Sequence, residues 1–304
     1  MNPKRIVLAG GSGFLGRALA RELAALQYEV VILTRAPHAR TDGIREAAWD
    51  GRHPGDWAAH LEGAAAVINL TGKNINCPHT PDNLHDLAAS RVDSVHALAA
   101  ALAQTKQPPR LWVQASATGY YGDTGDHAAD EHAPAGDNPL AKICRQWEGA
   151  FAAVAAPQTR KVTMRIGFVL GRDGGALPVL SRLTRWFLGG AAGDGRQYIS
   201  WIHLADLVEM FLTMVRRENL TGTFNAVAPG AVTNAEFMSE LRRALHRPWS
   251  PSAPVFAVRL GTALMRSEPS LAFVSQRCTP AKFLELEFKY QFPQLRAALA
   301  DLCR

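Results

Sequence analysis

The sequence predicts an α/β fold in which a doubly wound parallel sheet carries a smaller C-terminal lobe. Short apolar runs alternate with longer amphipathic stretches through the first half of the chain, as in consecutive strand–helix–strand units. A glycine-rich turn separates the first apolar run from the first amphipathic stretch. The length of 304 residues, with 47% hydrophobic residues, is sufficient for one large domain and a smaller lobe.

The periodicity of apolar residues places the elements of this fold in chain order. Runs rich in apolar residues predict strands at Arg5–Ala9, Glu29–Thr34, Glu46–Trp49, Ala65–Leu70, Leu111–Ala115, Val162–Ile166 and Gly222–Val227. Amphipathic stretches predict helices at Phe14–Gln27, Asp82–Ala103, Pro139–Ala153, Asn234–Leu245 and Pro293–Leu302.

The first predicted strand ends in a turn with the spacing G-x-x-G-x-x-G, formed by Gly10, Gly13 and Gly16. In a Rossmann-type fold the first glycine permits a tight turn, the second lets the backbone approach a pyrophosphate, and the third lets the helix pack close to the sheet. Amides at the helix start then face the phosphates, aided by the helix dipole. The position between a strand and a helix therefore predicts a dinucleotide site. Its expected contacts come from Gly10, Ser12, Gly13, Phe14, Leu15 and Gly16.

The end of the second predicted strand indicates which dinucleotide is bound. NAD sites usually place an Asp or Glu there, bonded to the ribose 2′-hydroxyl. This strand ends in Thr34 and Arg35, and the next acidic residue is Asp42. A guanidinium can form charge-assisted hydrogen bonds with a 2′-phosphate, to which Thr34 can add a hydroxyl contact. The sequence therefore predicts NADP(H) as cofactor, with NADPH favoured over NADH, although Arg35 could also be a solvated surface residue.

Residues 1–170 are expected to form the NADP-binding Rossmann domain and residues 171–304 the C-terminal substrate lobe, with 222–227 returning to the sheet. The formal charge of +6 is spread along the chain, so no nucleic-acid partner is expected. No apolar run approaches the roughly 20 residues of a membrane span, and no membrane partner is expected. The four cysteines lack metal-ligand spacing, which predicts no metal site and a reducing, cytoplasmic location. The expected partner is a small-molecule substrate, and the oligomeric state is left open.

Ordered motifs along nearly the whole chain carry a family resemblance. They include Gly10–Gly16, Thr34-Arg35, Asn69–Gly72, Ser90-Arg91, Gly119–Gly122, Trp147-Glu148, Arg165–Gly171, Gly174–Leu177, Gly195–Gln197, Trp201–Asp206, Asn225–Pro229 and Phe288–Leu295. The sequence resembles the extended, epimerase-like branch of the short-chain dehydrogenase/reductase superfamily. More narrowly, it is similar to "epimerase family" proteins with a C-terminal domain of unknown function. The resemblance implies a Rossmann-type fold and further NADP(H) contacts from Leu70, Thr71, Arg91 and the Phe168-Val169 turn.

The catalytic pair of that superfamily is missing from this sequence. Its enzymes usually carry Tyr-x-x-x-Lys on the helix after the fifth strand, where the lysine lowers the pKa of the tyrosine. None of the five tyrosines has a lysine four residues later. Aligning the helix through Glu148 puts Leu140 and Cys144 at the two positions. Lys142 is expected on another face, about 200° around the helix.

Two residues are candidates for replacing that relay. Ser116, at the end of the fifth strand, is a candidate hydrogen-bond donor to substrate, and Tyr121 is a candidate acid. Tyr121 could instead be a packed aromatic residue with a satisfied hydroxyl. Arg91 could meet a cofactor phosphate or a substrate anion, or remain a surface cation.

The pair His203 and Asp206 lacks a third metal ligand, which favours a hydrogen-bonded structural role at a helix start. Two functions remain open from the sequence. One is an NADP(H)-dependent oxidoreductase or epimerase-like enzyme acting on a small polar substrate. The alternative is a non-catalytic NADP(H)-binding protein that acts as a redox sensor or regulator.

Overall fold

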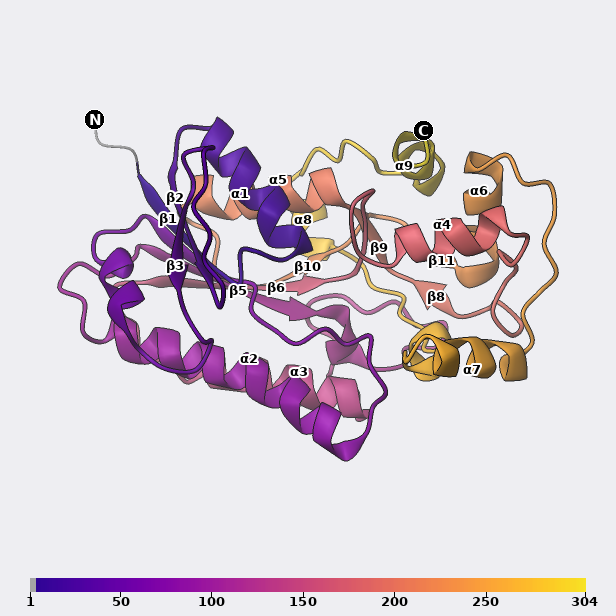
Figure 1. The fold of residues 1–304 in the computed structure, drawn as a ribbon, viewed down its shortest axis with the longest axis horizontal. Helices are drawn as coiled ribbons and strands as arrows, with labels where there is room; N and C mark the ends of the chain where they lie inside the picture. Colours follow the sequence, from indigo (N-terminus) through magenta and orange to yellow (C-terminus); the bar gives the residue numbers. More distant parts are fainter. Residues whose placement is uncertain (1–3) are drawn as a thin grey trace.

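The computed structural model describes residues 4–304 and contains a seven-stranded parallel sheet (Figure 1). The strands follow the order β10-β6-β5-β4-β1-β2-β3 across the sheet. Their bounds are β1 Arg5–Ala9, β2 Glu29–Thr34, β3 Arg45–Ala48, β4 Ala66–Asn69, β5 Leu111–Ala117, β6 Arg160–Ile166 and β10 Gly222–Ala226. The doubly wound fold is confirmed, and the late strand joins the sheet beside β6 as expected.

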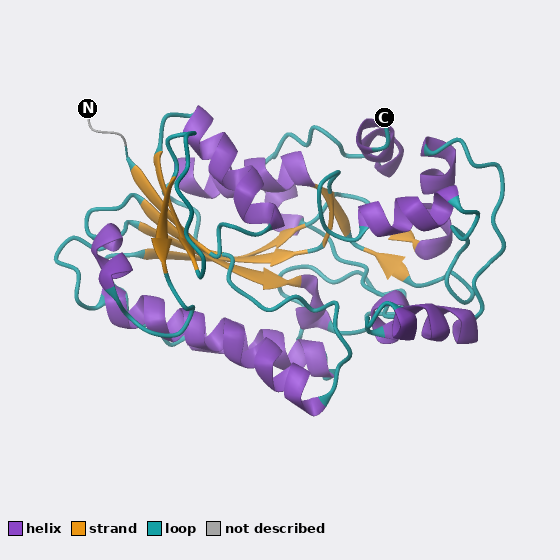
Figure 2. Cartoon of the chain, viewed as in Figure 1, coloured by secondary structure: helices purple, strands orange, loops and turns teal. Residues whose placement is uncertain are grey.

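Both faces of the sheet are covered, and the central strands β1, β2 and β4 are therefore almost entirely apolar and buried. Successive residues of a strand point to opposite faces. Ile6 and Leu8 of β1 accordingly lie in one core with the helices α1 (Phe14–Ala25) and α5 (Leu204–Arg216). On the other face Val7 packs with α2 (Pro81–Leu102) and α3 (Pro139–Ala152). Figure 2 shows these two helical layers above and below the strands.

The topology brings the ends of several strands to one edge. Because β1 lies between β2 and β4, the strand order reverses there, and such a switch point is where open α/β sheets bind ligands. The register aligns Ala9 of β1 with Asn69 of β4, and Asn69 with Gln114 of β5. The turns after β1, β4 and β5 therefore open on the same side of the molecule.

The rest of the chain forms the smaller lobe and a tail. The pair β7 (Phe168–Leu170) and β9 (Trp201–His203) is parallel, and β8 (Tyr198–Ile199) pairs with β11 (Val232–Thr233) in antiparallel fashion. The helices are α4 (Leu177–Arg185), α6 (Asn234–Ala244), α7 (Val255–Leu264), α8 (Ala281–Glu285) and α9 (Leu295–Leu302). Short 3-10 helices cover Asp56–Leu61 (η1), Thr118–Tyr121 (η2) and Pro269–Ala272 (η3). In the described residues, no helix has both the length and the apolar character needed to cross a membrane.

Three segments after residue 170, namely α5, β10 and α8, pack with or belong to the main sheet and its covering helices. Phe211 of α5 is fully buried in the same core as Leu19 of α1. Phe283 of α8 packs 5.4 Å from Phe224 of β10 and so covers the edge strand of the sheet. The division at residue 170 remains a prediction, with α5, β10 and α8 as the segments that cross it.

Candidate functional site

The turn after β1 has the close backbone contacts that only glycine allows. Gly10 has a φ of +74°, and a Cβ there would lie 3.0 Å from the backbone nitrogen of Thr71. A Cβ on Gly16 would lie 2.5 Å from the backbone of Gly11, so the helix start rests directly on the turn. Helix α1 begins at Phe14, its N-cap residue Gly13 offers no side-chain cap, and its first turn has no acidic residue. Its first amides are therefore left for an anion.

The end of β2 lies directly against this turn. The Thr34 hydroxyl donates a hydrogen bond of 3.1 Å to the Ser12 Oγ. Arg35 follows as an exposed residue, and within residues 4–304 no carboxylate oxygen lies within 4.0 Å of its guanidinium. Asp42, the next acidic residue after Arg35, is engaged by Arg40, whose hydrogen bonds lower the pKa of Asp42 to about 2. The guanidinium of Arg35 is therefore available for an external anion.

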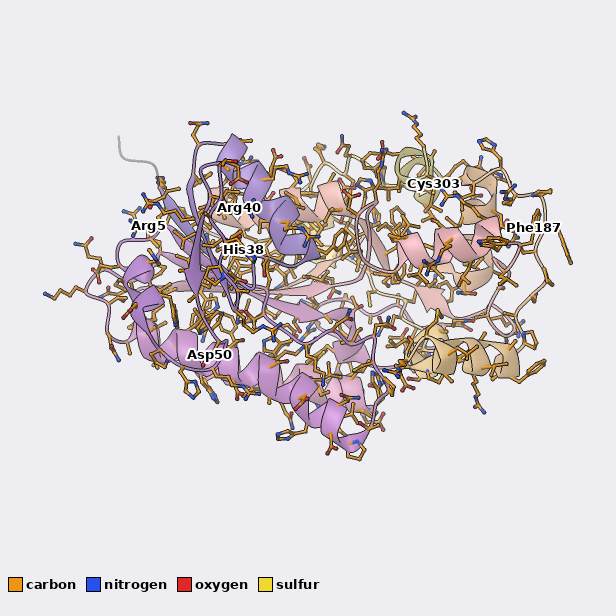
Figure 3. All side chains as sticks on the ribbon, viewed as in Figure 1. Arg5, His38, Arg40, Asp50, Phe187 and Cys303 are labelled. Atoms are coloured by element: carbon orange, nitrogen blue, oxygen red, sulfur yellow. The ribbon has the colours of Figure 1, made fainter. Side chains whose placement is uncertain are left out.

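The charge of Arg40 is paired within the protein. It bonds both Asp42 and Glu46, and it lies beside β2 and β3 together with His38 (Figure 3). Only Arg35, of these two neighbouring arginines, has the unpaired charge that a 2′-phosphate requires.

The turn after β4 contributes a second polar group to the same place. The backbone amide of Thr71 donates to Asn69 Oδ1 at 3.1 Å, which fixes the turn. Its hydroxyl is buried and finds no hydrogen-bond partner among the described residues, and it faces the Cα of Gly10. Such orphaned polar groups are costly unless a ligand or water satisfies them. Leu70, just before it, lies half-buried between the two cores.

Arg91 extends the site along α2. Its guanidinium carbon lies 5.2 Å from the Trp147 ring centroid, and Nη1 donates to the Leu87 carbonyl at 2.9 Å. A Cβ on Gly72, next to Thr71, would lie 3.1 Å from that guanidinium carbon. Burial lowers the pKa of Arg91, and no described carboxylate forms an ion pair with it. The position of Arg91 beside the β4 turn suits an anionic partner. Its contact with a cofactor phosphate or a substrate anion remains a prediction.

The turn after β7 covers the glycine loop from the other side. A Cβ on Gly171 or on Gly174 would meet the Phe14 ring at 2.4 Å, and one on Gly175 would lie 3.1 Å from the Val169 carbonyl oxygen. Phe14 and Val169 thus lie close together beside the glycine loop, and their contact with the cofactor stays a prediction. The structure fits a bound dinucleotide in three respects: the uncapped helix, the orphaned hydroxyl of Thr71 and the unpaired Arg35.

The place of the missing catalytic pair is also visible. A Cβ on Gly119 would lie 3.9 Å from Leu140 and 3.8 Å from the Cys144 sulfur, so both side chains face the turn after β5. Burial raises the pKa of the Cys144 thiol to about 12, which keeps it neutral. Lys142 is exposed, on another face of α3 as expected.

The Ser116 hydroxyl is bound within the protein. It donates a 2.6 Å hydrogen bond to Glu148 Oε1. The same carboxylate accepts two hydrogen bonds from Arg165. Nε donates to Oε1 at 2.9 Å, and Nη2 donates to Oε2 at 2.8 Å. Sequence reasoning gave Arg165 and Glu148 no role beyond the family motif. The available signal was the charge of Arg165 between the apolar residues Met164 and Ile166 of a predicted strand, since a buried cation needs a partner.

The Tyr121 hydroxyl is satisfied by the same network. It donates to Asn225 Oδ1 at 2.7 Å and accepts from Arg165 Nη1 at 2.9 Å. The side chain is 4% exposed, and its burial raises the pKa of the phenol above its usual value. The guanidinium of Arg165 also lies 3.4 Å from the Tyr120 ring centroid. These contacts match the packed alternative for Tyr121 and give no support to its use as an acid.

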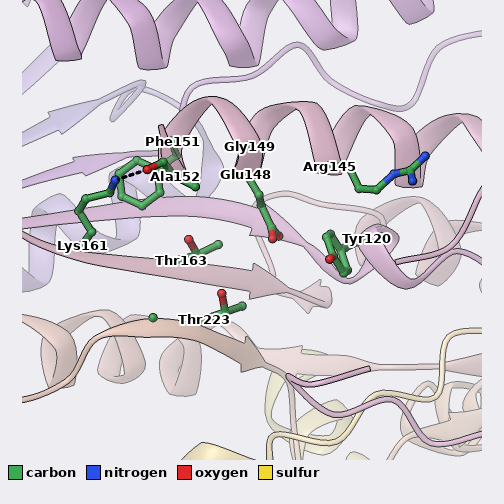
Figure 4. A pocket seen from close by; sticks show the side chains of 10 residues that line it. Tyr120, Arg145, Glu148, Gly149, Phe151, Ala152, Lys161, Thr163 and Thr223 are labelled. Atoms are coloured by element: carbon green, nitrogen blue, oxygen red, sulfur yellow. Dashed lines mark hydrogen bonds between the residues drawn. The ribbon is translucent and has the colours of Figure 1, made fainter. Parts of the chain in front are cut away.

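A cavity of about 440 Å³ lies behind this network, between α3 and the strands β6 and β10. Figure 4 shows Glu148, Tyr120, Lys161, Thr163 and Thr223 around it. None of the predicted cofactor residues lines it. The cavity is therefore separate from the cofactor site at the β1 turn.

His203 has the structural role expected from its sequence context. It caps α5, and its Nδ1 accepts a 3.1 Å hydrogen bond from the Ala205 amide. Asp206 accepts from the backbone amides of Gln291 and Phe292 and so fixes the tail. Within residues 4–304 no cluster of three His, Cys, Asp or Glu side chains is arranged to hold a metal ion.

Comparison with known proteins agrees with this geometry. The model of the NAD dependent epimerase/dehydratase family matches residues 6–226, and a Domain of unknown function (DUF1731) matches residues 253–302. The chain is 34% identical over 305 residues to the human epimerase family protein SDR39U1, covering 98% of this chain and 99% of that protein. An epimerase family protein of Mycobacterium leprae is 33% identical over 296 residues, covering 97% and 94%.

Solved structures give the same result. The crystal structure of human SDR39U1 with NADPH superposes with a TM-score of 0.88 at 32% identity, covering 98% of this chain and 99% of that one. A nucleoside-diphosphate sugar epimerase from Corynebacterium glutamicum gives a TM-score of 0.78 at 30% identity, with 99% of this chain and 58% of that one covered. The chain thus belongs to the NAD dependent epimerase/dehydratase family, in the group of epimerase family proteins that end in DUF1731.

Proposed function

We propose that the protein binds NADP(H), with NADPH favoured over NADH, and exchanges hydride with a small polar substrate held beside the nicotinamide. One observation carries the cofactor assignment: among the described residues the guanidinium of Arg35 has no carboxylate partner, and it follows the strand that lies against the uncapped start of α1. The structure of human SDR39U1 with NADPH supports the same cofactor. NADP(H) would supply the hydride, and the protein's contribution is to bind and position it.

The residues at the expected nicotinamide end limit the chemistry. Leu140 and the neutral thiol of Cys144 occupy the wall where a proton relay would stand. The hydroxyls of Ser116 and Tyr121 are engaged by Glu148, Asn225 and Arg165. The proton that accompanies hydride transfer therefore comes from ordered water or from the substrate itself, which favours substrates that need little acid assistance.

The test is a single-turnover experiment. Enzyme loaded with NADPH is mixed with a panel of carbonyl compounds and nucleotide sugars, and absorbance loss of the reduced nicotinamide is followed. Turnover of one member supports the enzyme, and the pH dependence of that rate should lack a tyrosine-like titration. No absorbance loss across the panel, with NADPH still bound, rejects hydride transfer.

A second function is favoured by one specific observation. The two positions where the superfamily carries Tyr and Lys hold the half-buried side chain of Leu140 and the buried thiol of Cys144, and neither can act as the usual proton relay. A protein that binds NADP(H) without turnover and reports the redox state needs no relay. It would show different stability or partner binding with NADPH and NADP⁺ in the absence of any substrate. All four cysteines are free thiols, which supports a reducing, cytoplasmic setting for either function.

A further inference from the structure

The end of the smaller lobe exposes large apolar side chains on two segments. On α7, Phe256, Leu260 and Leu264 are 73%, 62% and 80% exposed, and their spacing of four residues places them on one helical stripe. None of the residues of α7 is buried. A soluble monomer seldom leaves such a helix without a covering surface.

The second segment follows α4. Trp186 and Leu188 are 76% and 61% exposed, and Phe187 between them has a φ of +60°. This left-handed conformation is strained for an aromatic residue. Figure 3 shows Phe187 at the extremity of the molecule, and Figure 1 shows α4, α6 and α7 gathered at the same end. Trp249, in the loop before α7, is 66% exposed.

Contacts between the loops next to these two segments hold them at the same end of the molecule. Ala192 forms a β-bridge with Ala253, and the Arg242 guanidinium donates to the Gly189 carbonyl at 2.8 Å. The Arg247 guanidinium lies 5.3 Å from the Phe187 ring centroid. We refer to residues 182–188 and 247–266 as the apolar–arginine surface.

The charge on this surface has one sign. Residues 182–188 and 247–266 include five arginines and no Asp or Glu. Four of these arginines are exposed and have no carboxylate within 4.0 Å among the described residues; they are Arg182, Arg185, Arg259 and Arg266. An anionic partner complements such a surface.

We propose that the apolar–arginine surface docks on an anionic lipid bilayer. Trp, Phe and Leu side chains that project among arginines suit the boundary between headgroups and acyl chains. At ten residues α7 is about 15 Å long, so it would lie in the interface and not span the bilayer. The expectation of no membrane partner rested on the lack of a spanning run, which a peripheral surface does not need. The proposal is independent of the NADP(H) site.

The test is co-sedimentation with vesicles at low ionic strength. The full-length protein is mixed with vesicles of pure phosphatidylcholine, or of equimolar phosphatidylcholine and phosphatidylglycerol. The protein should sediment only with the anionic vesicles, and salt should release it. Each arginine near the surface contributes about fivefold in partitioning, so Arg→Gln at positions 182, 185, 259 and 266 together should weaken binding by roughly two to three orders of magnitude.

Matched variants separate this surface from general charge or hydrophobicity. The charge control carries Arg→Gln at positions 21, 110, 145 and 217, four exposed arginines outside the surface. The double variant Phe256→Ser/Leu264→Ser should lose binding, while Leu26→Ser/Leu284→Ser should keep it. The proposal is overturned if the wild type does not sediment with anionic vesicles, or if the controls lose as much binding. It is also overturned if Phe256→Ser/Leu264→Ser only converts a dimer to a monomer in light scattering, because the surface then joins two copies.

Discussion

The guanidinium of Arg165 binds the carboxylate of Glu148 through two parallel hydrogen bonds, 2.9 Å from Nε and 2.8 Å from Nη2. The pair joins the end of β6 to α3, with side chains only 6% and 14% exposed. Ser116 and Tyr121 attach to it from β5 and η2. The hydroxyls nearest to the expected nicotinamide position therefore belong to a structural network.

Replacing Glu148 with Gln should cost stability, because it leaves the Arg165 charge buried without its counter-ion. Removing one partner of a buried pair typically costs about 3–5 kcal/mol. Urea unfolding measures the loss. The double variant Glu148→Gln/Arg165→Met should recover part of it, since no unpaired charge then remains. Equal stability of Glu148→Gln and wild type would show that the pair contributes nothing.

Tyr121→Phe should lower stability by about 1–3 kcal/mol, because Asn225 and Arg165 each lose a buried hydrogen-bond partner. NADPH affinity should stay within about twofold of wild type, as no contact to the β1 turn changes. Thermal unfolding and fluorescence titration give the two values. If a turnover assay is found and Tyr121→Phe abolishes it while the fold is intact, Tyr121 is the proton donor after all.

Arg35→Ala should weaken NADPH binding about ten- to hundredfold and leave NADH binding nearly unchanged, because only NADPH carries the 2′-phosphate. Arg40→Ala is the matched control, since that guanidinium is paired with Asp42 and Glu46. Isothermal titration with both nucleotides distinguishes the two arginines. Equal losses for NADPH and NADH would remove Arg35 from the 2′-phosphate site.

The free energy of unfolding should fall as the pH drops below about 6.5, because His203 then becomes protonated. Burial lowers the pKa of its imidazole below the ordinary value of 6.5, so the folded state binds fewer protons than the unfolded chain. The contribution of neutral His203 to the free energy of unfolding is fully present above the pKa that His203 has in the unfolded chain. It is lost as the pH falls through the lower pKa that His203 has in the folded protein. His203→Asn, which retains an acceptor for the Ala205 amide, should flatten this dependence in chemical unfolding between about pH 7 and 5. An unchanged slope would assign the dependence to other groups.

The sequence was sufficient to predict the bounds of those elements that are encoded by a local pattern of residues. The strands β1 and β2 have the predicted bounds, and β3 begins at Arg45, one residue from the predicted start. The glycine spacing and the arginine after β2 identified the cofactor loop, because both signals lie within a few residues along the chain.

Packing contacts and ion pairs between segments far apart in the chain could not be predicted from such local patterns. The packing of α5 on α1 joins elements nearly 200 residues apart, and no local pattern encodes it. The Arg165–Glu148 pair links a strand to a helix, so the sequence showed the charge of Arg165 within β6 but not its partner. For the same reason the sequence did not show that the hydroxyls of Ser116 and Tyr121, the candidates for contact with substrate, are bonded to Glu148, Asn225 and Arg165.

The most direct test of the cofactor assignment is calorimetry of cofactor-free protein against NADPH, NADP⁺ and NADH. The Arg35 and glycine-turn geometry predicts binding of both phosphorylated nucleotides at least about tenfold tighter than NADH. No heat of binding with NADPH and NADP⁺, or equal affinity for NADH, would contradict it.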